Sequence, residues 1–74
     1  MTSEEFSRLS VYVHDARKPL NRISMQAELG KMALNGAVPP EKALVALDKI
    51  IRSAKDCSHT LAEMTSELSG NVSD

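Results

Sequence analysis

The chain has 74 residues, a formal net charge of −1 and a single cysteine, Cys57. A chain of this length forms at most one small domain, and short chains bury a smaller fraction of their surface on folding. Nine basic residues against ten acidic ones leave no excess positive charge for binding nucleic acid or an anionic membrane. One cysteine cannot form an internal disulfide, so the composition favours a reducing compartment.

The sequence also argues against a membrane or secreted protein. No apolar run approaches the roughly 20 residues that are needed to span a bilayer. Met1 is followed by acidic residues rather than by a basic secretory leader. We therefore expect a cytoplasmic protein with no direct membrane insertion and no nucleic-acid partner.

The first predicted element is an amphipathic helix from about residue 3 to about residue 35. Thr2 and Glu5 have the spacing of a capping box, in which each side chain accepts a hydrogen bond from the other residue's backbone. Apolar residues then recur at alternating steps of three and four, which is typical of a coiled-coil seam. This seam contains Phe6, Leu9, Val13, Ala16, Leu20, Ile23, Ala27, Gly30 and Leu34.

A turn is predicted over residues 36–40 and a second helix from about residue 41 to about residue 69. Gly36 suits the left-handed residue after a helix, and Pro40 suits the first turn of the next one. The ending SGNVSD, of which residues 70–74 are assigned to a tail, reads as a frayed terminus or linker. The second seam contains Ala43, Leu47, Ile50, Ala54, Cys57, Leu61, Met64 and Leu68.

Two long helices joined by a short turn predict an all-α fold, an antiparallel helical hairpin that forms one domain over residues 1–74. Further apolar residues lie outside both seams, and a two-helix hairpin cannot cover them. A symmetric homodimer, in which two hairpins form a four-helix bundle, would supply the missing core. These additional apolar residues are Met25, Leu29, Met32, Leu44 and Ile51.

His14 lies in a polar part of the first helix. Residues three, four and seven positions after it share its side of the helix, and these are Arg17, Lys18 and Asn21. Cationic side chains donate charge-assisted hydrogen bonds to phosphoryl oxygens, so this group could attract and position a phosphoryl group. The alternative interpretation is a solvated basic stripe with an ordinary surface histidine.

Pro19 interrupts this otherwise helical pattern five residues after His14. An interior proline removes one backbone hydrogen bond and clashes with the carbonyl four residues earlier, here that of Asp15, at a cost of roughly 3 kcal/mol. We expect a kink at this point of the helix.

The segment His14-Asp15-Ala16-Arg17-Lys18-Pro19-Leu20 resembles the H-box of sensor histidine kinases. In that family the box has a histidine, an acidic residue, any residue, arginine, any residue, proline and leucine. It lies in the first helix of the dimerisation and histidine-phosphotransfer domain, also called the DHp or HisKA-type domain. The match includes every fixed position of the box, and the helix–turn–helix pattern extends over essentially the whole chain.

The resemblance implies roles for the residues of the box. His14 would be the phosphoacceptor, and Asp15 the acidic partner that orients or deprotonates it. Arg17 would act through electrostatics or helix pairing, and Pro19 would form the kink. Lys18 and Asn21 would contact the phosphoryl group or a partner. Lys18 stands where members that dephosphorylate their response regulator typically have threonine or asparagine, so we expect little phosphatase activity.

The resemblance also implies partners. ATP and Mg²⁺ would bind to a separate kinase catalytic domain, because nothing in these 74 residues resembles an ATP-binding domain, and we expect no cofactor on this chain. The receiver domain of a response regulator would accept the phosphoryl group on an aspartate. The sequence leaves open a free-standing protein or a domain of a longer kinase, and also a non-phosphorylated adaptor or inhibitor. Cys57 and His59 diverge on a helix, so no metal site is expected.

Overall fold

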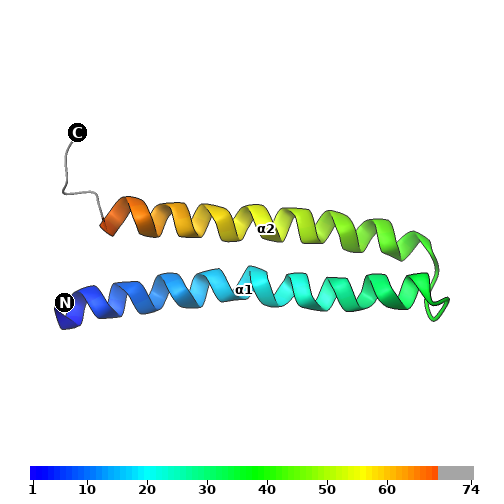
Figure 1. Cartoon of the computed structure of the whole chain (residues 1–74), viewed down its shortest axis with the longest axis horizontal. Helices are drawn as coiled ribbons and strands as arrows, with labels where there is room; N and C mark the ends of the chain where they lie inside the picture. The colour runs from blue at the N-terminus through cyan, green and yellow to red at the C-terminus, as the bar shows by residue number, and fades with distance from the viewer. Residues whose placement is uncertain (69–74) are drawn as a thin grey trace.

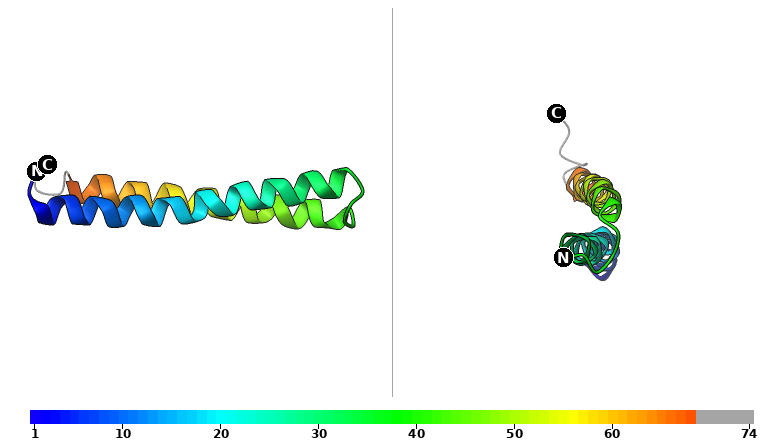
Figure 2. Two further views of the ribbon diagram at one scale, coloured as in Figure 1. Left: turned by 90° about the horizontal axis from the view of Figure 1, so that it is seen from below. Right: turned by 90° about the vertical axis from the view of Figure 1, so that its right-hand side faces the viewer.

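The computed structural model describes residues 1–68 and consists of two helices, α1 (Ser3–Leu34) and α2 (Glu41–Leu68). The helices run antiparallel, so the start of α1 and the end of α2 lie at the same end of the molecule (Figure 1). They form a single layer (Figure 2). The all-α hairpin is therefore confirmed, and α1 ends one residue earlier than the sequence predicted. The predicted last residue of the second helix, 69, and the tail at 70–74 lie outside the described residues.

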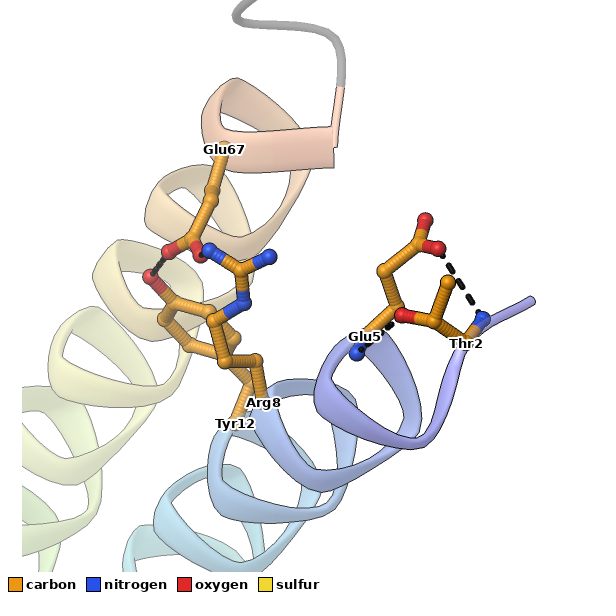
Figure 3. A network of polar contacts seen from close by, with 5 residues as sticks. All are labelled: Thr2, Glu5, Arg8, Tyr12 and Glu67. Atoms are coloured by element: carbon orange, nitrogen blue, oxygen red, sulfur yellow. Dashed lines mark hydrogen bonds and ion pairs between the residues drawn. The ribbon is translucent and has the colours of Figure 1, made fainter.

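The capping box at the start of α1 is present as predicted. The Glu5 backbone N–H donates to Thr2 Oγ1 at 3.1 Å, and the Thr2 backbone N–H donates to Glu5 Oε1 at 3.0 Å (Figure 3). The hydrogen bonds from Thr2 lower the pKa of Glu5, because they favour its charged form. The stabilisation from this carboxylate is therefore present at neutral pH and is lost as the pH falls through the lowered pKa.

Gly36 ends α1 in the left-handed conformation, with φ of +80°. The Gly36 N–H donates to the Ala33 carbonyl at 3.2 Å, and the Ala37 N–H donates to the Met32 carbonyl at 2.9 Å. These two bonds define a Schellman motif, which satisfies carbonyls that the helix end leaves free. Pro40 directly precedes α2, whose first residue is Glu41. The chain therefore reverses direction over a few residues.

Small side chains fill the contact between the helices. Among the residues that the structure describes, the buried ones other than Pro19 have small side chains, and no large side chain is fully buried. At Gly30, a Cβ atom would lie 3.9 Å from Ala46 Cβ, so the two backbones approach closely there. The buried residues of this contact are Ala16, Pro19, Ala33, Ala46, Ser53 and Cys57. One layer of small side chains provides little apolar burial for a folded chain.

Only half of each predicted seam packs in this contact. In α1, Leu9, Ala16, Ile23 and Gly30 are buried or half-buried, whereas the other members of the seam are exposed. In α2, every second member of the seam is packed in the same way, and these residues are Ala43, Ile50, Cys57 and Met64. The exposed stripes, each with a spacing of seven residues, contain Phe6, Val13, Leu20, Ala27 and Leu34 in α1 and Leu47, Ala54 and Leu61 in α2.

Charged residues border the contact between α1 and α2 on the side opposite the exposed stripes. Arg22 Nη2 lies 3.3 Å from Asp56 Oδ2, and Arg22 Nε donates to Ser53 Oγ at 3.3 Å. Near the open end, Arg8 Nη1 lies 3.3 Å from Glu67 Oε1, and the Tyr12 hydroxyl donates to the same carboxylate (Figure 3). These pairs cross from α1 to α2, so they place the charged borders of both helices on one face.

The two exposed stripes consequently share the opposite face of the hairpin. On each helix, the stripe lies on the side of the contact away from the residues that form the cross-helix ion pairs. We name this surface the apolar face, and the surface with the ion pairs the polar face. The two stripes contain no charged residue. The hairpin is thus a ribbon with two chemically different sides.

Substitution by alanine should have opposite effects on stability at Gly30, inside α1, and at Gly36, just after its end. Gly36→Ala should lower the free energy of unfolding by about 1 kcal/mol, since an L-residue is strained at positive φ although nothing lies within 4 Å of the new Cβ. Gly30→Ala should raise it by up to about 1 kcal/mol through helix propensity, because the new contact at 3.9 Å is ordinary. Urea unfolding followed by circular dichroism, at one protein concentration, measures both. Equal effects of the two substitutions would contradict this account.

Candidate functional site

His14 lies on the side of α1 that faces away from α2. Tyr12 and Ala16 both lie on the packed side, and His14 is two residues from each, a rotation of about 200° on a helix with 3.6 residues per turn. His14 is exposed. The imidazole is therefore open to an incoming molecule.

Asp15 contacts Lys18 rather than His14. Lys18 Nζ lies 3.8 Å from Asp15 Oδ1, and both side chains are about half exposed or more. Asp15 and His14 form no hydrogen bond in the described part of the chain. An exposed pair of this kind contributes only a few tenths of a kcal/mol, so Asp15 can exchange Lys18 for another partner at little cost.

Arg17 and Asn21 are exposed, as the sequence predicted for the side of the helix that carries His14. Within residues 1–68, neither side chain forms an ion pair or a hydrogen bond with another side chain. Both keep their full set of donors for a ligand or partner. Of the predicted group, the structure brings only Lys18 and Asp15 into contact with each other.

Pro19 is buried between the helices, while α1 continues through it from Ser3 to Leu34. Its ring packs toward α2, and its missing N–H leaves the Asp15 carbonyl without the usual helical donor. The helical defect is therefore one turn from His14 and is held in place by the hairpin contact. This packing explains how the helix tolerates a proline in its interior.

Polar contacts between the helices were not anticipated from the sequence. The Glu67 carboxylate raises the pKa of Tyr12, because its hydrogen bond holds the phenol proton. A further pair lies within α2, where His59 Nε2 is 3.5 Å from Glu63 Oε1 of the next turn. The Arg22–Asp56 pair lies further along the hairpin. The charges of Arg22 and Asp56 beside the two seams are visible in the sequence, whereas the register that brings them together is not.

The described residues offer no obvious place for a metal ion, since no three side chains of His, Cys, Asp or Glu gather among them. Cys57 is buried in the helix contact, and His59 is exposed. No helix in the described part of the chain is both long and apolar enough to cross a membrane.

Comparison with protein-family models, with curated proteins and with solved structures found no match for this chain. The residues themselves therefore carry the functional information: the order of side chains around His14, the exposure of that histidine and the two faces of the hairpin.

Pro19→Ala should stabilise the protein. Alanine restores a donor for the Asp15 carbonyl and removes a helix-interior cost of roughly 3 kcal/mol, while the lost packing of the buried ring offsets part of that gain. We expect a net increase in the free energy of unfolding of about 1–2 kcal/mol in urea titrations. Ser24→Ala, at an exposed position of the same helix, serves as the control and should raise stability by less than about 0.5 kcal/mol. A less stable Pro19→Ala protein would show that packing of the ring dominates.

Proposed function

We propose that this chain is a histidine phosphoacceptor and dimerisation module of two-component signalling, resembling the DHp domain of sensor histidine kinases. The observation that carries the proposal is the order His-Asp-x-Arg-x-Pro-Leu at residues 14–20, with its histidine exposed on a long helix of a two-helix hairpin. ATP and Mg²⁺ would be bound by a separate catalytic domain. An aspartate of a receiver domain would be the final acceptor.

In the proposed reaction, a ring nitrogen of His14 attacks the γ-phosphorus of ATP. A P–N bond forms, the bond from that phosphorus to the β–γ bridging oxygen breaks, and ADP leaves. The proton displaced from the imidazole goes to Asp15 or to water. A receiver carboxylate then attacks the same phosphorus, the P–N bond breaks, and His14 is regenerated.

The surroundings of His14 support this chemistry. The weak contact of Asp15 with Lys18 leaves the carboxylate free to turn toward the imidazole when a phosphoryl donor arrives. Arg17 provides a cation without a partner among the described residues, which suits the negative charge that a phosphoryl group brings. Pro19 removes a backbone hydrogen bond of α1 next to His14, at the point where the histidine must meet different partners in turn.

We further propose that a second copy of the chain covers the apolar face, giving a homodimeric four-helix bundle. The face is charge-free along its two stripes and keeps the seven-residue spacing that lets helices interlock. Its large side chains are about half exposed or more, for example Phe6 at 64% and Leu47 at 54%. A symmetric pairing covers identical stripes on both copies, so self-association matches the pattern on both sides of the interface.

Phosphorylation should require His14. With a cognate catalytic domain and labelled ATP, the native chain should acquire an acid-labile, alkali-stable label, and His14→Gln should acquire none. Because His14 is exposed, the substitution should leave the helical content and melting temperature nearly unchanged. Asp15→Asn should slow labelling without changing the oligomeric state, since it removes a base but no core contact.

His59→Gln is the matched control, because it removes an exposed histidine from the other helix. This variant should be labelled like the native chain. Labelling that persists in His14→Gln or that depends on His59 would refute the assignment. A native chain that binds the kinase or receiver and is never labelled would instead identify an adaptor or inhibitor.

Charge on the apolar face should prevent dimerisation. Leu47→Lys places two lysines in the symmetric interface and should weaken association by more than about tenfold, seen as a lower melting temperature at the same protein concentration. Val45→Lys is the control: Val45 is 45% exposed on the same helix but lies outside the apolar face. Equal behaviour of the two variants would argue against this interface.

A further inference from the structure

The polar face carries a second group of converging side chains, separate from the H-box. They line a shallow pocket of about 200 Å³ between the two helices. Arg22, which borders it, is eight residues after His14 and thus roughly 12 Å further along α1. The pocket is lined by Arg22, Gln26, Lys49, Arg52, Ser53 and Asp56.

The pocket has more positive than negative charge. Arg22 is paired with Asp56, the one acidic residue of the lining, with 3.3 Å between Nη2 and Oδ2. Lys49 and Arg52 form no ion pair within residues 1–68. The charges of these two side chains are therefore left without compensation, and they lie less than one helical turn apart on α2.

Hydrogen-bond donors remain available in the pocket. Arg22 uses two of its five N–H groups for Ser53 and Asp56, so three are free. Ser53 is only 4% exposed and accepts from Arg22, which leaves its own proton to donate. Gln26 also lines the pocket, and its Oε1 is buried without a hydrogen-bond partner among the described residues; a half-turn of this amide would put an N–H donor in the position of Oε1.

We propose that this pocket binds a phosphate group, either as the free ion or as a small phosphomonoester. A phosphate carries a charge of about −1.5 to −2 near pH 7, which matches the uncompensated charges of Lys49 and Arg52. Its tetrahedral oxygens can accept hydrogen bonds from several directions, and the donors belong to both helices. A carboxylate has fewer oxygens and a single charge, so it fits this set less well. The inference does not depend on phosphorylation of His14.

Nuclear magnetic resonance titration of the ¹⁵N-labelled full chain tests the site. Inorganic phosphate and glycerol phosphate are added separately, with sodium chloride adjusted to keep the ionic strength constant. We expect saturable shifts of amide signals from α1 near Arg22 and from α2 near Arg52. A response to one of the two compounds identifies whether the free ion or the ester is the ligand, and a response to both defines a general phosphate site.

Arg52→Gln should weaken phosphate binding by at least about tenfold, because it removes a charge-assisted hydrogen bond. Lys55→Gln removes the same charge from an exposed position on the side of α2 away from α1 and should leave the affinity within about twofold. Glutamine is a good helix former, so both variants should fold. His14→Gln should bind phosphate like the native chain, which separates this site from the proposed phosphoacceptor.

Either of two results would overturn the proposal. One is the absence of saturable shifts with both phosphate compounds. The other is an equal loss of affinity in Arg52→Gln and Lys55→Gln, which would mean that phosphate responds to net charge alone.

Discussion

The close approach of α1 and α2 through small side chains is the constraint on which the rest of the structure depends. Ala16, Ala33 and Ala46 occupy the contact, and Gly30 leaves room for the opposing helix. Small residues allow close packing but bury little apolar area, so the contact alone gives the hairpin a thin core. The apolar residues of the two stripes are consequently exposed on one face, while ion pairs occupy the other. A protein with such a surface gains stability by covering its apolar face.

The same contact determines how the candidate site is presented. Because Tyr12, Ala16 and Pro19 face α2, the geometry of the helix turns His14 toward solvent. The proline, five residues after the histidine, is buried against α2, so the defect in α1 lies on the packed side of the helix while His14 lies on the exposed side. The polar face of the hairpin carries the ion pairs between the helices. Its pocket combines Lys49 and Arg52 of α2 with Arg22 of α1. The two proposed phosphate-related sites thus occupy different surfaces of one hairpin.

Much of this fold could be predicted from the sequence, because local signals determine it. The Thr2–Glu5 spacing indicated the start of α1, and Gly36 indicated its end. Heptad spacing predicted two helices, yet it could not tell which half of each seam packs within the hairpin, since both halves are apolar. The exposure of His14 followed from its place beside the seam. The Tyr12–Glu67 and Arg22–Asp56 contacts join residues more than 30 positions apart, so they depend on the register of two helices that no local pattern specifies.

The central claim is that a second copy of the chain completes the core that one hairpin leaves open. Sedimentation equilibrium of the native chain at micromolar concentrations measures this most directly. We expect a mass of twice the 8.1 kDa of one chain, with dissociation accompanied by loss of helical structure on dilution. A helical and cooperatively folded species with the mass of a single chain would contradict it.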